Sequence, residues 1–163
     1  MATALKNLSE TSLEENKIFK SLHIGLVVAD WNEEITYSMR DAAIDFLLEK
    51  GVQKKHIHVH AVPGTFELPL GAQWLASKSK MDAVIAIGCV IQGETRHFDF
   101  ICDACANGIT EVSLKLNKPV IFGVLTTNNL EQAKDRSGGK HGNKGIEAAD
   151  TALKMCLLNK SLF

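Results

Sequence analysis

Three elements follow one another in residues 83–100, which read AVIAIGCVIQGETRHFDF. Residues 83–87 are an unbroken apolar run, which predicts a strand buried on both faces of a parallel sheet. The pattern changes at Gly88, and residues 92–97 follow as a polar turn. Apolar residues then recur at spacings of three and four, which predicts a helix with one buried face: Phe98, Ile101, Cys105, Ile109, Val112 and Leu116.

A strand, a glycine-bearing turn and a helix N-terminus together can hold an anion. Free backbone N–H groups and the positive end of the helix dipole converge at such a turn. His97 stands there and is suited to move protons on a bound molecule. Turns of this kind are also obligatory connections in any α/β fold, so the turn alone leaves a purely structural interpretation open.

Alternating strand and helix patterns continue on both sides of this stretch. Apolar runs predict strands over residues 23–29 and 120–125, and an alternating pattern predicts a strand over residues 56–62. Amphipathic patterns predict helices over residues 36–50, 68–77, 98–116 and 144–158, with a short helix that begins in a capping box at Asn128 and Glu131 and ends near Arg136.

This alternation at short spacing indicates a parallel sheet with helices on both faces. We expect a flavodoxin-like three-layer α/β sandwich with a four-stranded sheet of order 2-1-3-4. Residues 18–163 form one domain in this interpretation, and residues 1–17 form a polar, mobile N-terminal tail.

Composition excludes several classes of protein. A chain of 163 residues that is 45% hydrophobic and 23% charged fits one globular domain. The formal net charge of −1 argues against a nucleic-acid partner. No apolar run approaches the roughly 20 residues of a membrane span, and residues 1–17 lack the features of a signal or transit peptide. Four cysteines among apolar neighbours indicate reduced thiols, so we expect a cytoplasmic location.

Two patterns resemble metal sites. His56, His58 and His60 share one face of a predicted strand, but adjacent side chains on a strand diverge and no carboxylate or cysteine completes the set. A half-exposed edge strand explains this alternation more simply. Cys102 and Cys105 lie inside a helical pattern without a second pair, whereas a closed zinc site needs four ligands. We therefore predict no metal site.

Three turns carry unusual residues: Trp31-Asn32, Pro63 to Glu67, and Val90 to His97. All such turns emerge at the carboxyl edge of a parallel sheet, and ligands bind there, where the strand order reverses. With the order 2-1-3-4, Trp31 and His97 face one crevice. An exposed indole at that point would be a stacking platform for a flat heterocycle.

Four motifs, in this order, resemble the 6,7-dimethyl-8-ribityllumazine synthase family: Ala29 to Asn32, Val62 to Pro69, Gly88 to Asp99, and Gly142 to Gly145. The resemblance covers about residues 20–158. It implies a transferase that condenses 5-amino-6-(D-ribitylamino)uracil with 3,4-dihydroxy-2-butanone 4-phosphate. The products are the lumazine, phosphate and water, in the penultimate step of riboflavin biosynthesis, and no cofactor or metal is needed.

The resemblance also implies residue roles, with His97 as the proton-transfer residue. The substrate-binding positions are Trp31, which stacks on the pyrimidine, with Asn32 beside it; Thr65, Phe66 and Glu67 along the ribityl chain; Cys89, Val90 and Ile91 along the ring; Glu94 and Thr95 in the phosphate loop; Phe122 as a wall; Arg136 on the phosphate; and Lys144 near the pyrimidine. The family often has phenylalanine where this chain has Trp31, and a basic residue where it has Gln92.

These residue types suit the implied chemistry. Imine formation, phosphate loss and ring closure each move protons near neutral pH, where histidine titrates, with an ordinary pKa of about 6.5. Arg136 would supply a planar cationic fork for the phosphate. Holding two substrates in reactive geometry would supply much of the rate.

The family forms pentameric rings with sites shared between neighbours, and some members close rings into an icosahedral shell. We expect Ile18 to Ser21 to pair with the free edge of strand 56–62 on the next subunit, in a head-to-tail contact. In such a ring, Phe66 and Phe122 would belong to a different subunit than some of the other residues of the same site. The compact segment 136–145 resembles that of shell-forming members, so we expect a hollow shell, with a pentamer as the alternative. Riboflavin synthase is a possible partner.

Two alternative functions fit this sequence less well. A flavin-binding electron carrier shares the strand order, but it needs a phosphate loop rich in Gly, Ser and Thr after the first strand. Here that turn, Asp30 to Glu34, is acidic and lacks glycine. A structural shell subunit without activity would not need His97, Arg136 and Glu67. Both alternatives are therefore disfavoured.

Overall fold

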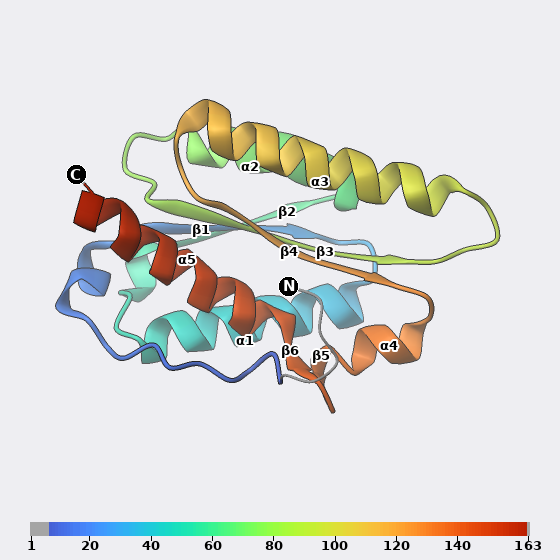
Figure 1. Ribbon diagram of the computed structural model, residues 1–163, viewed down its shortest axis with the longest axis horizontal. Coiled ribbons are helices and arrows are strands. Elements are labelled where there is room, and N and C mark those ends of the chain that lie inside the picture. Colours follow the sequence, from blue (N-terminus) through green and yellow to red (C-terminus); the bar gives the residue numbers. More distant parts are fainter. Residues whose placement is uncertain (1–6, 163) are drawn as a thin grey trace.

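A four-stranded parallel sheet of order β2-β1-β3-β4 forms the middle layer of the protein (Figure 1). The structure is a computed structural model and describes residues 7–162. The strands are β1 (Ile24–Ala29), β2 (Ile57–Val62), β3 (Ala83–Ile91) and β4 (Val120–Thr127). The predicted fold class and strand order are confirmed.

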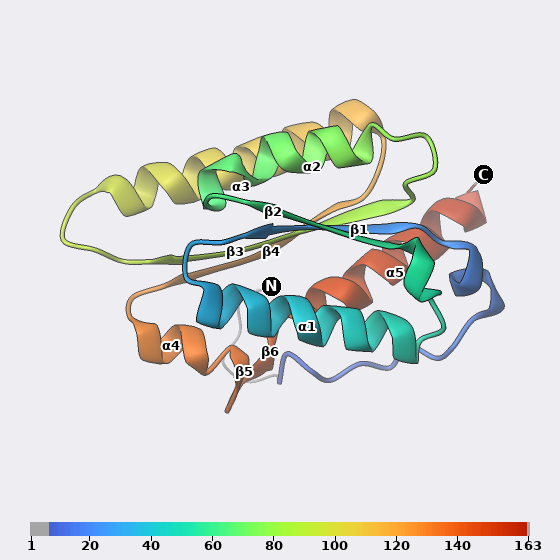
Figure 2. The same cartoon turned by 180° about the vertical axis from the view of Figure 1, so that it is seen from behind.

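Helices cover both faces of this sheet. Helices α2 (Leu68–Ala76) and α3 (His97–Leu116) lie on one face, and α1 (Glu33–Glu49) and α5 (Lys144–Leu162) lie on the other, as the views from opposite sides in Figures 1 and 2 show. The shorter elements are η1 (Lys17–Ser21), η2 (Lys54–His56), η3 (Thr65–Glu67), α4 (Leu130–Lys134), β5 (Ser137–Gly139) and β6 (Gly142–Asn143). Within residues 7–162 no helix is long and apolar enough to cross a membrane.

The central strands are buried because both of their faces are covered. Along β3, Ile85 and Ile87 belong to the hydrophobic cluster on the α1 and α5 side, whereas Val84 and Ala86 belong to the cluster on the α2 and α3 side. A fully buried isoleucine contributes about 1.5–3 kcal/mol. This two-sided burial is why the strand reads as an unbroken apolar run rather than as an alternating pattern.

Strand β3 is longer than the predicted strand 83–87. It continues through Gly88 to Ile91 and stays paired with β4 as far as Thr127, although its pairing with β1 ends at Val28 and Ile87. Gly88 does not end the strand. The space beside its Cα, where another residue would have a side chain, is occupied by Thr65 and Leu68. A Cβ there would lie 2.9 Å from Thr65 Oγ1 and 2.8 Å from Leu68 Cδ1. The last residues of β3 therefore project beyond β1 at the carboxyl edge.

The segment before β1 differs from its prediction. Lys17–Ser21 is a 3-10 helix, in which Asn16 accepts a hydrogen bond from the Ile18 N–H at 3.1 Å. Phe19 is completely buried in the core of its own chain. The prediction of a short extended piece at Ile18 and Phe19 is therefore wrong. The predicted contact of Ile18 to Ser21 with the β2 edge of a neighbouring subunit stays a prediction.

The described part of the N-terminal tail lies against the domain. The Leu8 N–H donates to the His141 carbonyl at 2.8 Å, and the Asn143 N–H donates to Ser9 Oγ at 3.0 Å. Thr11 Oγ1 donates to Asp150 Oδ1 on α5 at 2.5 Å. Residues 7–16 thus contact the last helix and the turn before it. The predicted mobility of the tail stays a prediction, and residues 1–6 of that tail lie outside the described residues.

The region before α5 also contains local differences. Helix α4 is capped one residue later than predicted, because the Asn129 side chain accepts the Gln132 N–H at 2.9 Å. Residues 137–143, predicted only as a break, form the antiparallel pair β5 and β6. The break is therefore an ordered hairpin.

A cluster of histidines joins the amino ends of β1 and β2. His23 Nδ1 lies 3.1 Å from His58 Nε2, and the His56 ring stacks on His23 with 4.0 Å between ring centroids. The Asp82 carboxylate accepts the backbone N–H of His23 at 2.8 Å. Across residues 7–162, no group of three or more His, Cys, Asp or Glu side chains is arranged to hold a metal ion.

Both hydrogen-bonded histidines resist protonation. Burial is the main cause that lowers the pKa of His23 and of His58 below the ordinary value of 6.5. Nearby positive charges lower the pKa further: His56, Lys80 and Lys55 act on His23, and His23, Lys78, His60 and His56 act on His58. Asp82 acts in the opposite direction on His23.

The histidine cluster should make the protein less stable in mild acid. Because the pKa of each ring is lower in the folded chain, the unfolded chain takes up protons first as the pH falls through 6.5. The urea midpoint should therefore fall between pH 7.5 and pH 5.5, and it should fall less in His58→Gln, which keeps a hydrogen-bond acceptor but cannot titrate. An equal fall in both proteins would contradict this prediction.

Candidate active site

A cleft of about 350 Å³ opens at the carboxyl edge of the sheet. It lies where the strand order reverses, between the turns that follow β1 and β3. Trp31 and His97 both line it, so the prediction that they face one crevice is confirmed. The complete lining is Trp31, Asn32, Gly64, Thr65, Phe66, Glu67, Cys89, Val90, Ile91, Gly93, Thr95, His97, Phe98 and Ile101.

The turn after β1 presents Trp31 to solvent. Its side chain is 72% exposed, so the indole face is available to a ligand. The turn itself is held by its backbone, because Asp30 N–H donates to the Val62 carbonyl at 2.8 Å and Trp31 N–H donates to the Pro63 carbonyl at 3.2 Å. An exposed ring on a tethered backbone is suited to stack on a flat molecule.

The turn after β2 forms η3 and supplies a second wall. Thr65 is buried, whereas Phe66 is 57% exposed, so one residue anchors the turn and the next faces the cleft. Thr65 rests on the surface of β3 left open by Gly88. Packing between η3 and β3 therefore positions Phe66 and Glu67.

Adding a methyl group at Gly88 should disturb this packing. The Gly88→Ala Cβ would lie under 3.0 Å from both Thr65 and Leu68, and overpacking of this kind costs about 1–3 kcal/mol of unfolding free energy. Gly93→Ala, in the turn that follows β3, is the matched control, because its Cβ would meet nothing within 4 Å. Urea denaturation measures both variants. Equal stability of the two would contradict the packing role of Gly88.

The end of β3 gives the cleft an uncharged wall. Cys89 is buried, and burial raises the pKa of its thiol from 9.0 to about 12. The thiol therefore stays protonated at neutral pH and is not a nucleophile. Val90 and Ile91 extend this wall outward, which suits contact with a planar ring.

The polar turn and the start of α3 close the cleft. His97 is the first residue of this 20-residue helix, and its N–H donates to Thr95 Oγ1 at 3.4 Å. No side chain caps the helix at Arg96, so its positive end faces the turn. Phe98 and Ile101 also line the cleft. The sequence pattern assigned Phe98 and Ile101 only to the buried face of the helix. Their position within about one turn of His97 could have indicated that they also line the site.

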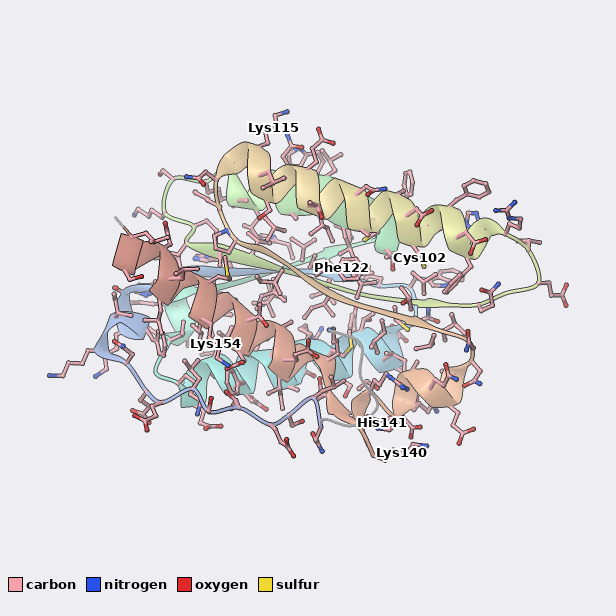
Figure 3. All side chains as sticks on the ribbon, in the orientation of Figure 1. Cys102, Lys115, Phe122, Lys140, His141 and Lys154 are labelled. Carbon is pink, nitrogen blue, oxygen red and sulfur yellow. The ribbon has the colours of Figure 1, made fainter. Side chains whose placement is uncertain are left out.

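Four predicted site residues do not line this cleft. Glu94 lies in the same loop and is exposed. Phe122 lies on β4 below α3 (Figure 3) and contacts the core cluster on that side. Arg136 follows α4 and donates from Nη1 to the Gln132 carbonyl at 2.9 Å, and Lys144 Nζ lies 2.9 Å from Glu147 Oε1 at the start of α5.

The lining of the cleft, drawn entirely from the described residues, includes no lysine or arginine. A phosphate bound in the cleft of one chain would therefore contact no lysine or arginine side chain of the lining. The roles predicted for Phe122, Arg136 and Lys144 stay predictions, and they require these residues to reach a cleft other than that of their own chain.

Comparison with known proteins gives one consistent result. A family model described as 6,7-dimethyl-8-ribityllumazine synthase matches residues 21–160. A protein of that name from Cytophaga hutchinsonii is 64% identical over 155 residues, which covers 95% of this chain and 97% of the relative. Proteins of the same name from Porphyromonas gingivalis (53% over 160 residues, covering 98% and 99%) and Parabacteroides distasonis (48% over 155 residues, covering 95% and 97%) are also similar.

Proposed function

The chain belongs to the 6,7-dimethyl-8-ribityllumazine synthase family, and we propose from this membership that it performs the family's condensation in riboflavin biosynthesis. The substrates are 5-amino-6-(D-ribitylamino)uracil and 3,4-dihydroxy-2-butanone 4-phosphate, and the enzyme is a cytoplasmic transferase. The observation that carries the proposal is the cleft at the switch point, which an exposed Trp31 and His97 line together.

The pyrimidine ring would stack on Trp31 and lie along Cys89, Val90 and Ile91. The wall formed by Cys89, Val90 and Ile91 suits a flat heterocycle, because a buried protonated thiol and two aliphatic side chains carry no charge. The ribityl hydroxyl groups would then extend toward Thr65 and Glu67 on η3, which line the same cleft.

His97 would carry the proton transfers. The amine of the pyrimidine attacks the ketone carbon and a water leaves, giving an imine. Removal of a proton from the adjacent carbon then allows the C–O bond to the phosphate to break, which leaves an enol. The enol takes up a proton on its terminal carbon and gives up its O–H proton, which forms a second carbonyl. The ribitylamino nitrogen attacks this carbonyl, and ring closure releases another water. Each step needs a group that accepts and returns a proton near neutral pH, which imidazole does well.

The phosphate would be held from two sides. Thr95 Oγ1 accepts the His97 N–H, so its hydroxyl proton and the positive end of the α3 dipole can face a phosphate in the cleft. Because the cleft lining contains no lysine or arginine, Arg136 of a neighbouring subunit is the proposed source of positive charge for the phosphate. Lys144 of that subunit would lie near the pyrimidine. The predicted wall residue Phe122 would reach the site in the same way.

A fluorescence assay tests the proposed reaction. Purified protein mixed with both substrates should produce the fluorescent lumazine and release phosphate at the same rate, and omission of either substrate should abolish both signals. Absence of lumazine with both substrates present would refute the proposed function. A bound flavin in the purified protein with no turnover would favour an electron carrier instead.

The free edge of the sheet supports assembly into a ring. No residue of β2 is buried, and Val59 on this strand is 42% exposed. Trp74 and Leu70 on α2 are 67% and 50% exposed. An edge strand with exposed apolar neighbours needs cover, and a head-to-tail contact between copies would supply it.

We expect these rings to close into a hollow icosahedral shell, within which riboflavin synthase is a possible partner. Segment 136–145 is compact, because β5 and β6 pair directly before α5 begins. Sedimentation velocity should therefore show a particle much larger than a pentamer of 17.8 kDa chains. A species no larger than a pentamer at every phosphate concentration and pH would contradict the shell.

A further inference from the structure

Asn32 has a backbone conformation that most residues avoid. Its φ of 62° and ψ of 45° lie in the left-handed region, where asparagine is among the few side chains tolerated. Within residues 7–162, Asn117 is the other non-glycine residue with positive φ, and it ends α3, where this conformation is common. Asn32 instead precedes a helix, where a cap residue normally has extended backbone.

Asn32 also does not use its side chain as a helix cap. An asparagine before a helix usually accepts an N–H from the first turn, but the Asn32 side chain makes no such bond to α1. Its backbone carbonyl accepts the Ile35 N–H at 2.9 Å and the Thr36 N–H at 3.0 Å. The side chain is thus free to contact another part of the chain.

That contact is on β3. Asn32 Nδ2 donates to the Cys89 carbonyl at 2.9 Å, across 57 residues of sequence. The pairing of β3 with β1 ends at Ile87, so no β1 residue pairs with Cys89 in the strand register. The side-chain amide of Asn32 therefore continues the link between the β1 turn and β3 beyond the last strand pair.

This link bears directly on Trp31. The Trp31 ring is mostly exposed, so its position depends on the backbone that carries it. That backbone is tied to the end of β2 through the Pro63 carbonyl and to the end of β3 through the Asn32 side chain. Without the Asn32 side chain, the turn would keep its hydrogen bond to the Pro63 carbonyl after β2. It would lose its hydrogen bond to Cys89, which belongs to the cleft wall opposite Trp31.

We propose that Asn32 is a positioning residue, which sets the distance between the Trp31 ring and the Cys89–Ile91 wall by bridging the two with its side-chain amide. The inference rests on the proposed function in so far as the pyrimidine binds between ring and wall. It differs from the role implied by family resemblance, because the Nδ2 group is occupied by the protein and not by the substrate.

Substitutions can remove the side-chain bridge of Asn32 while the left-handed backbone conformation is still tolerated. Asn32→Asp keeps the shape of the side chain but places an oxygen against the Cys89 carbonyl, so the bridge is lost. Asn32→Gly accepts positive φ readily and also lacks the bridge. Asn117→Gly is the matched control, because Asn117 has the same backbone conformation away from the cleft.

The experiment measures the mobility of the Trp31 side chain directly. The chain has two tryptophans, and Trp74 does not line the cleft, so all variants are made in a Trp74→Phe background. Fluorescence anisotropy decay then reports the mobility of Trp31 without any substrate. Steady-state kinetics with the pyrimidine and thermal unfolding complete the set.

Both Asn32 variants should increase the mobility of Trp31 and raise KM for the pyrimidine by about tenfold or more, with a smaller effect on kcat, because small displacements of a positioning group have large effects on productive binding. Asn117→Gly should leave Trp31 mobility and KM unchanged. Wild-type Trp31 mobility and KM in Asn32→Asp would overturn the proposal.

A rise in KM with unchanged Trp31 mobility would also overturn the proposal, since it would indicate a direct substrate contact. A lower unfolding temperature without a change at Trp31 would show a purely structural role and overturn it as well. If the wild-type protein makes no lumazine, the proposed function fails, and the anisotropy comparison still decides whether Asn32 positions Trp31.

Discussion

Replacing His97 with alanine is expected to lower turnover by about 10²- to 10⁴-fold, the usual range for loss of a general acid–base group. His97 begins α3, is exposed and lines the cleft with Trp31. The KM of either substrate should change much less than turnover, because the ring, wall and phosphate contacts remain. Steady-state rates of lumazine formation measure both quantities.

His97→Gln is the matched variant. Glutamine can still form hydrogen bonds but cannot carry a proton near neutral pH, so its turnover should fall nearly as far as that of the alanine variant. Circular dichroism should show the same helix content in both, because His97 is exposed and its side chain supports no core packing. Unchanged turnover in His97→Ala would remove the proton-transfer role.

Two inactive variants should restore activity to each other when they assemble together. In the proposed site between subunits, Arg136→Ala and His97→Ala would damage contributions from different chains, because the cleft that His97 lines does not contain Arg136. In a head-to-tail ring each cleft meets the neighbour's Arg136, so random mixing would leave about a quarter of the sites with both groups intact. Mixed, dissociated and reassembled protein should therefore recover about that fraction of wild-type activity.

The control pair is His97→Ala with Trp31→Ala. Both residues line the cleft of one chain, so every cleft in the mixture keeps one lesion and no activity should return. Assays use butanone phosphate below its KM, where loss of a bidentate arginine has its full effect. Recovery in neither mixture would place Arg136 in the same chain's site as His97, whereas an active Arg136→Ala protein would place Arg136 outside the working site.

Much of the fold could be predicted because both faces of the sheet are covered. Strands buried on two faces must be apolar throughout, so β1 and β3 appear in the sequence as unbroken runs. The helices between them have one apolar face, which sets a different period. These two patterns identify the elements, and the confirmed strand order then brings Trp31, His97 and η3 to one edge.

Contacts between distant segments were harder to predict. Gly88 looked like the end of a strand, but in the folded chain Thr65 and Leu68 occupy the space beside it and β3 continues. Lys17–Ser21 looked extended, but burial of Phe19 draws it into a short helix. The polar segment 7–16 offered no local pattern, since its hydrogen bonds go to His141, Asn143 and Asp150.

The sequence by itself determined the family of this protein, its layered fold and the residue types at the cleft, because these depend on local motifs and on periodic burial. The tertiary structure decided which of those residues meet in one chain. Arg136 and Lys144 have site roles that the family resemblance implies, yet they lie away from the cleft that Trp31 and His97 line. It also revealed the bridge from Asn32 to Cys89, since a hydrogen bond between a turn and a strand 57 residues away depends on packing that no local pattern records.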